Sequence, residues 1–281
     1  MNGSIRNAAA ALLAGVVSFG FAYAEEPKRP WTDTADFGLT FTTGNTENLN
    51  FALGNKFKYT WTKSELLFDA VALRNQSTAT SLSYDGTTVT KTDTKSVTAE
   101  AFALALKFRQ DITPRLYWFA ATSWYRNTFA GLDARYLAGG GVGYIFVKEP
   151  RHVFRGEGGL DFTRQDPVGD PPPSELETKD FVSAHFFLGY EFAISDTAKL
   201  TEDLNLFDNL DTTSDWRANS ITAVTASMTS KLAIKVSYTV LYSNEPPVHV
   251  VPDTVAPIGP DAVVPFEKTD TILAAALVIN F

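Results

Sequence analysis

The feature of this sequence that most constrains its fold is a two-residue alternation of apolar and other side chains, repeated in segments of roughly ten to thirteen residues. In segment 269–281 the odd-numbered positions from Leu273 to Phe281 are all apolar, and in segment 231–243 the even-numbered positions from Leu232 to Tyr242 are apolar or aromatic while Lys235 and Ser237 lie on the other face. Because a β-strand places successive side chains on opposite faces, each segment is predicted to be a strand. The weakest segment is 198–207, since Glu202 falls on its apolar face. About twelve segments are found: 35–43, 49–60, 65–76, 96–109, 115–126, 134–146, 152–164, 181–192, 198–207, 217–229, 231–243 and 269–281.

The prolines support these boundaries independently. Proline cannot donate a backbone hydrogen bond and is excluded from central strands. All 14 prolines fall outside the twelve segments, and most of them lie in two long connections, 165–179 and 244–267. The connections alternate between short and long along the chain, and aromatic residues gather near the segment ends. This pattern is typical of an antiparallel transmembrane β-barrel with short periplasmic turns, longer outer loops and aromatic girdles.

The sequence therefore predicts an all-β fold, a closed up-and-down transmembrane β-barrel of about twelve strands over residues 35–281. A soluble β-sandwich or lipocalin-like barrel would also alternate and avoid proline. It would not explain the rhythm of long and short connections or the aromatic residues beside them.

The N-terminus has the pattern of an export signal. Residues 1–24 combine one cation, Arg6, with a short apolar stretch and the small-residue triplet that ends at Ala24. We expect cleavage after Ala24, a periplasmic tail over 25–34, and localisation in the bacterial outer membrane. The apolar stretch is shorter than the ~20 residues that a membrane-spanning helix needs.

Composition excludes several kinds of protein. The net charge of −8 argues against nucleic-acid binding, and the absence of cysteine excludes disulfides and thiolate chemistry. The three histidines show no metal-binding spacing, so neither a metal nor a cofactor is expected. The glycine run at Gly139–Gly141 lacks the Lys and Ser/Thr of a phosphate loop and is interpreted as a bend in the strand or a close approach of backbones.

Two stretches resemble known outer-membrane sequences. The opening Phe37-Gly38-Leu39-Thr40-Phe41-Thr42-Thr43-Gly44-Asn45-Thr46-Glu47 resembles the YdiY-like family, whose members are labelled salt-induced outer membrane proteins and carry a domain of unknown function. The turn Thr43, Gly44, Asn45 and Thr46 carries the resemblance, together with the following Lys56-Phe57-Lys58-Tyr59. The family implies an outer-membrane barrel without an established activity. Leu277, Ile279 and Phe281 resemble the C-terminal signal read by the barrel-assembly machinery, which is therefore an expected partner.

Charged residues are predicted on the lumen side of many segments. Such charges either pair into a plug or line a water path, and the pattern leaves both open. The predicted lumen charges are Asp36, Lys56, Lys58, Asp69, Lys107, Arg109, Arg135, Arg155, Glu157, Asp161, Lys199, Asp203, Lys231 and Lys235. The predicted outer connections hold 15 acidic and 3 basic residues, as counted in 44–48, 77–95, 127–133, 165–179, 208–216 and 244–267. We therefore expect contact with outer-membrane lipids and with lipopolysaccharide through bridging divalent cations.

These features predict a non-enzymatic barrel, either a narrow channel or an envelope-stress structural barrel, with its oligomeric state left open. The alternative is a lipid-active enzyme, an outer-membrane phospholipase or a lipid A-modifying barrel. Ser183 and His185 share one strand face, as a nucleophile and its base would. The alternation places that face in the lumen, away from the lipid substrate such an enzyme needs. No catalytic residue is therefore assigned.

Overall fold

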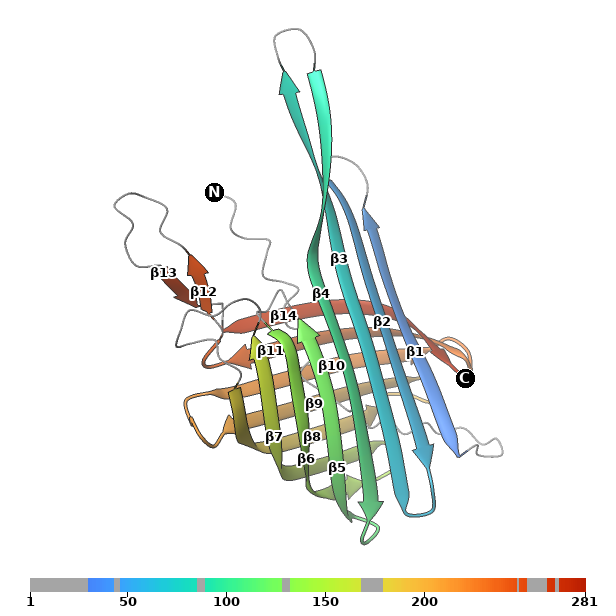
Figure 1. Cartoon of the computed structure of the whole chain (residues 1–281). Coiled ribbons are helices and arrows are strands. Elements are labelled where there is room, and N and C mark those ends of the chain that lie inside the picture. The colour runs from blue at the N-terminus through green and yellow to red at the C-terminus, as the bar shows by residue number, and fades with distance from the viewer. Residues whose placement is uncertain are drawn as a thin grey trace.

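A computed structural model describes residues 30–42, 46–84, 89–127, 132–167, 179–246, 248–251, 262–265 and 268–281, and the expected signal peptide lies outside these ranges. Twelve strands form a closed barrel in which each strand pairs antiparallel with its neighbour and the first pairs with the last (Figure 1). Within the described residues, no helix is long and apolar enough to cross a membrane. The barrel strands are β1 (Trp31–Thr42), β2 (Thr46–Thr60), β3 (Ser64–Tyr84), β4 (Val89–Asp111), β5 (Leu116–Asn127), β6 (Leu132–Lys148), β7 (His152–Pro167), β8 (Lys179–Ala193), β9 (Ala198–Asn209), β10 (Trp216–Ser227), β11 (Leu232–Ser243) and β14 (Thr269–Asn280).

The predicted fold class is confirmed, and the alternation has the expected orientation. Val236 and Leu188 leave 46% and 43% of their surface exposed on the outer wall, whereas Ser183 is 1% exposed and points inward. The outer wall is therefore an apolar belt of the kind that faces lipid, and polar side chains gather inside. Other exposed apolar side chains of this belt are Leu53, Leu104, Val142, Leu160, Phe162, Phe186 and Ile234.

The structure differs from the prediction in three parts of the chain, and the first two involve barrel strands. β1 begins at Trp31, which pairs with Tyr59, so the last residues of the expected 25–34 tail belong to the barrel wall. The expected loop 77–95 is mostly a β-hairpin, because β3 and β4 stay paired out to Tyr84 and Val89. Figure 1 shows this hairpin projecting beyond the other strands. Serine and threonine are frequent in this part of the sequence, so no apolar alternation marks it.

The expected connection 244–267 also contains structure. A two-stranded sheet of β12 (Val248–Val251) and β13 (Ala262–Pro265) lies apart from the barrel. Pro265 is the last residue of β13, and Pro167 is the last residue of β7. Both positions are strand ends, where the missing backbone donor is tolerated.

Candidate functional site in the barrel lumen

The lumen beside β4 to β8 is filled by a cluster of charged and aromatic side chains, which we call the buried charged cluster: Lys107, Arg109, Tyr117, Arg155 and Glu157. Glu157 is at its centre. Its Oε2 lies 2.5 Å from Lys107 Nζ, and the Tyr117 hydroxyl donates a 2.8 Å hydrogen bond to its Oε1. Glu157 is 6% exposed and Tyr117 is fully buried, so this carboxylate relies on protein partners rather than on water.

Aromatic faces and further carboxylates complete the cluster. Lys107 Nζ lies 4.4 Å from the Phe119 ring centroid, and Arg109 Cζ lies 3.9 Å from that of Tyr117. These distances are within the range of cation–π attraction. Arg155 Nη1 is 3.4 Å from Glu191 Oε1, and Arg109 Nη2 is 2.8 Å from Asp111 Oδ1. The buried cations of the cluster are thus matched by carboxylates, as a plug requires.

Glycines on β6 make room for the cluster. A Cβ atom added at Gly143 would lie 2.2 Å from Tyr117 Cζ, and one at Gly139 would lie 1.9 Å from Asp161 Oδ1. A Cβ at Gly141 would come within 2.2 Å of the Gly158 carbonyl oxygen on β7. The interpretation of the glycine run as a close approach is confirmed. Because these positions have no side chain, the long side chains of β4, β5 and β7 can meet across β6.

Ser183 and His185 are not arranged as a nucleophile and its base. His185 Nδ1 lies 3.2 Å from Asp161 Oδ2, and its Nε2 lies 3.1 Å from Asn205 Oδ1. The imidazole also stacks on Phe207, with ring centroids 4.4 Å apart. Both ring nitrogens are therefore directed at other residues. Asp161, predicted as a lumen charge, is 2% exposed and serves this cross-strand contact.

The other side of the lumen, beside β1, β2, β11 and β14, is more accessible. Lys56 Nζ lies 3.8 Å from Asp69 Oδ1, and the Lys56 side chain is 40% exposed although it points inward. Lys235 Nζ lies 2.9 Å from Asp36 Oδ2, with both side chains about a quarter exposed at 26% and 21%. Charges on several strands act on Asp69, including those of Lys235 and of Asp203 on β9.

The remaining predicted residues are placed as follows. Lys58 points inward on β2 and is partly buried, but Lys231 is an exposed residue of the turn before β11. Lys231 therefore lies at the rim, not in the lumen wall, because β11 begins one residue later than predicted. Thr43, Gly44 and Asn45 lie outside the described residues, and Thr46 begins β2. Leu277 and Phe281 are 40% and 61% exposed, and Ile279 lies between them on β14.

The sequence pattern does not assign Tyr117 of the cluster, or Phe119 beside it, to the lumen. Segment 115–126 is aromatic on both faces, so its alternation does not tell inward from outward residues. The alternation of segment 181–192 places Glu191 on the lumen face, but it does not predict the partner Arg155, which is 36 residues away in the chain.

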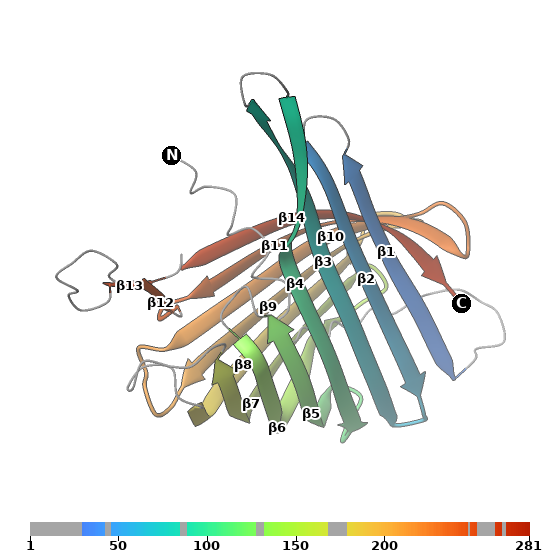
Figure 2. The same cartoon turned by 45° about the horizontal axis from the view of Figure 1, so that its top comes forward.

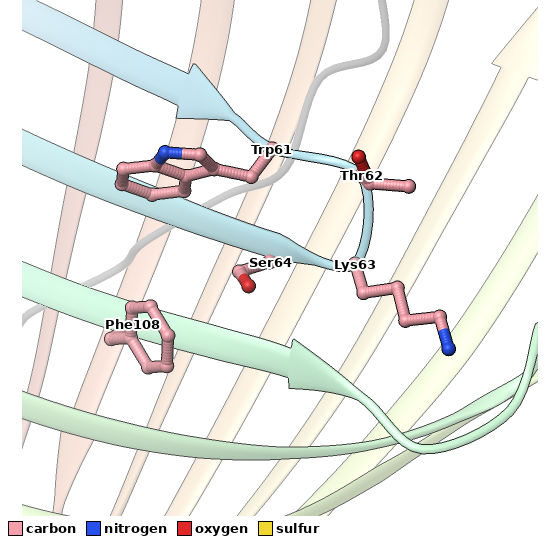
Figure 3. A pocket seen from close by; sticks show the side chains of 5 residues that line it. All are labelled: Trp61, Thr62, Lys63, Ser64 and Phe108. Atoms are coloured by element: carbon pink, nitrogen blue, oxygen red, sulfur yellow. The ribbon is translucent and has the colours of Figure 1, made fainter.

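A second candidate lies on the outside of the barrel, at the β2–β3 turn. Figure 3 shows this shallow surface pocket, which is lined by Trp61, Thr62, Lys63, Ser64 and Phe108. Trp61 packs against Tyr59 with ring centroids 4.5 Å apart, so the pocket belongs to the aromatic girdle at the short-turn end. Within the described residues, no group of three or more His, Asp or Glu side chains could hold a metal ion.

Comparison with known proteins identifies the family. The sequence profile described as "Protein of unknown function, DUF481" matches residues 35–281. The chain belongs to the DUF481 family. It is 26% identical over 220 residues to the Escherichia coli K12 protein called "Uncharacterized protein YdiY", covering 78% of this chain and 77% of that protein. The expected kinship with YdiY-like proteins is thus confirmed.

Two solved barrels are similar to this DUF481 chain. The COG4313 outer membrane channel from Pseudomonas putida F1 aligns with a TM-score of 0.49 at 12% identity, over 94% of this chain and all of that one (100%). The translocator domain of the autotransporter NalP from Neisseria meningitidis aligns with a TM-score of 0.46 at 13% identity, over 92% and 90% of the two chains.

Proposed function

We propose that this DUF481 barrel is a narrow outer-membrane channel for small ions, with its path beside β1, β2, β11 and β14. The observation that carries the proposal is the contrast between two lysines of one lumen. The Lys107 side chain is 7% exposed inside the buried charged cluster, whereas the inward Lys56 side chain is 40% exposed. A lumen lysine with that exposure borders space that water can enter, which supports a path on this side of the barrel and not through the buried charged cluster.

The charges along this path favour weak selectivity. Lys56 faces Asp69, and Lys235 faces Asp36, so much of the lysine charge is compensated locally. The inward lysines Lys58 and Lys199 add positive charge near the short-turn end. Lumen charges act at close range, while outer-loop charges are screened beyond about 8 Å at physiological ionic strength. We expect a slight preference for anions that grows at high salt.

The experiment is conductance of the refolded protein in planar bilayers, with the reversal potential measured across a salt gradient. The wild type should conduct with weak anion preference, and Lys56→Glu combined with Lys235→Glu should make the preference cationic. Lys63→Glu is the matched control, because Lys63 is exposed in the β2–β3 turn outside the barrel. Absence of conductance at every salt concentration would refute the channel and favour a structural barrel of the envelope.

The same proposal includes location and partners. Export through a signal cleaved after Ala24 would deliver the barrel to the assembly machinery and then to the outer membrane. Mass spectrometry of the mature protein should find Glu25 at its N-terminus.

The acidic outer connections would hold lipopolysaccharide through divalent cations, so chelation should release lipopolysaccharide that copurifies with the protein. The family label further implies induction by salt, which transcript measurement in low- and high-salt media tests.

A further inference from the structure

Two inward arginines lie at the long-loop end of the barrel, and we call them the outer arginine pair: Arg135 and Arg217. Arg135 is the fourth residue of β6 and Arg217 is the second residue of β10, so both lie just below the outer connections. Tyr136 and Trp216 are 50% and 39% exposed on the outer wall, so the alternation turns the two arginines into the lumen. Figure 2 shows β6, β10 and the three strands between them running side by side.

The guanidinium of Arg135 has a neutral partner. Its Nε and Nη2 donate hydrogen bonds of 3.1 and 2.6 Å to Oε1 of Gln165 on β7. Within the described part of the chain it forms no ion pair with a carboxylate. In the buried charged cluster, by contrast, Lys107 and Arg155 each lie beside a carboxylate. The Arg135 charge therefore lacks the compensation that a cation needs when protein surrounds it.

Arg217 is only loosely paired. Its Nε lies 4.0 Å from Asp215 Oδ1, and this buried nitrogen has no hydrogen-bond partner among the described residues. The carboxylate is engaged elsewhere, because Asp215 Oδ2 accepts a 3.0 Å hydrogen bond from Asn209 Nδ2. The other side of the guanidinium faces Phe181, whose ring centroid is 5.5 Å away. Two guanidinium charges are thus set against the single carboxylate of Asp215.

A buried hydroxyl group lies beside the same carboxylate. Ser183 is the register partner of Asn209, the residue that donates to Asp215. Ser183 is 1% exposed, and in the described structure its Oγ has no hydrogen-bond partner. Buried polar atoms in folded proteins are normally satisfied by protein, by water or by a ligand. The groups left over here, a guanidinium N–H and a hydroxyl, are both donors, and an anion accepts from donors.

The electrostatics of the pair favour the same kind of ligand. Of the charged groups that act on Arg135, Arg217 has the largest effect, and the effect is repulsive. An anion close to both guanidinium groups replaces this repulsion by attraction. The planar fork of N–H groups on arginine matches two oxygens of a carboxylate or a phosphate, which makes such oxyanions better ligands than a halide ion.

We propose that the outer arginine pair binds the oxyanion group, a carboxylate or a phosphate, of a small solute that enters from the long-loop end. Arg135 and Arg217 hold the anion, and the Ser183 hydroxyl supplies a further donor. This goes beyond the proposed channel for small ions, whose path lies beside β1, β2, β11 and β14. Binding at the pair needs no ion flow, so the two proposals fail separately.

Binding is tested with inorganic phosphate and the refolded protein in detergent micelles that contain no lipid. The phosphorus NMR line of phosphate should broaden saturably with the wild type, and acetate should reverse the broadening. Arg135→Gln and Arg217→Gln should each weaken the binding several-fold. Arg164→Gln is the matched control, because its side chain is 55% exposed on the outer wall, next to Gln165 on β7. No broadening with the wild type, or equal broadening with Arg135→Gln, would overturn the proposal.

A second measurement needs only the wild type, so it does not depend on the folding of variants. Phenylglyoxal modifies arginine side chains, and mass spectrometry of the peptides reports the rate at each position. Phosphate should slow the modification of Arg135 and Arg217 several-fold and leave Arg164 unchanged. Equal protection of all three would show general screening and refute the site. Protection of Arg135 by added lipopolysaccharide but not by free phosphate would show that a lipid phosphate is the ligand, and the proposed solute would be wrong.

Discussion

Lys235 on β11 and Asp36 on β1 form an ion pair that spans the closure of the barrel, with Nζ and Oδ2 2.9 Å apart although the residues are 199 positions apart in sequence. The strand between them, β14, has Ala276 and Val278 at this level on its inner face. Small side chains there let the lysine reach over the strand. The pair therefore links β11 to β1 across β14, at the place where backbone pairing between β1 and β14 stops.

We expect this pair to contribute modestly to stability. Lys235→Met and Asp36→Asn should each lower the free energy of unfolding, and the double mutant should lose less than the sum. Because both side chains are partly exposed, a coupling of about 0.5–1 kcal/mol is expected. Urea titration in vesicles measures it, with Lys231→Met in the exposed turn as the control. A coupling of zero would mean that the closure depends on backbone pairing alone.

The Lys107–Glu157 pair should matter more, because it is buried. Glu157→Leu leaves the Lys107 ammonium without its nearest carboxylate, and losing one partner of a buried pair costs about 3–5 kcal/mol. Lys107→Met combined with Glu157→Leu should recover much of the lost free energy of unfolding, because both members of the ion pair are removed and neither is left charged without its partner. Unfolding midpoints in urea give both values. If the double mutant were no more stable than Glu157→Leu, the burial of charge would not be the cause.

Gly143 on β6 and Gly158 on β7 offer a test of packing in which the two changes are chemically identical. Gly143→Ala places a Cβ 2.2 Å from the Tyr117 ring and should destabilise the barrel by about 1–3 kcal/mol, because the tyrosine must move off Glu157. Gly158→Ala is the control, since its nearest atom is Phe186 Cδ1 at 3.9 Å. Unfolding free energies in vesicles compare them. Equal losses would show that glycine is needed for strand geometry and not for space.

All twelve barrel strands could be predicted because each has one face toward lipid and one toward the lumen. The lipid face requires an apolar side chain at every second position. Prediction fails where that constraint ends. The hairpin beyond Gln76 is paired as regularly as the barrel wall, but its sequence is rich in serine and threonine and shows no apolar alternation. Glu202 weakened the prediction of β9, yet the structure satisfies it locally: its carboxylate accepts hydrogen bonds from Ser220 and Thr222 on β10.

The inward charges were largely predictable, but their partners were not. Lys107 and Glu157 lie 50 residues apart, on strands separated by β5 and β6. Whether they meet depends on barrel curvature and on the glycines of β6, which the alternation does not encode. Register irregularities, such as those between Leu132 and Ala134 and between Ile145 and Val147, also shift partners by one residue.

The lipid-facing orientation can be tested on two adjacent residues. Val236 is 46% exposed on the outer wall and Ser237 faces the lumen next to it. Arginine on the lipid face near mid-bilayer costs about 2–4 kcal/mol, and lumen changes cost much less. Val236→Arg should therefore reduce folding into vesicles far more than Ser237→Arg, as measured by heat-modifiable mobility in electrophoresis. Similar losses from both would contradict the orientation.

The C-terminal residue should act in assembly rather than in stability. Phe281 is 61% exposed, and its backbone N–H donates a 3.0 Å hydrogen bond to the Asp33 carbonyl oxygen. Phe281→Asp keeps that backbone bond but removes the terminal aromatic ring. We expect less barrel in the outer membrane and more protein in the periplasm, while the purified variant still folds in vesicles; Phe281→Leu should be affected less. If Phe281→Asp failed equally in cells and in vesicles, the ring would stabilise the folded barrel directly. Wild-type levels in outer-membrane fractions would instead show that the assembly machinery does not need it.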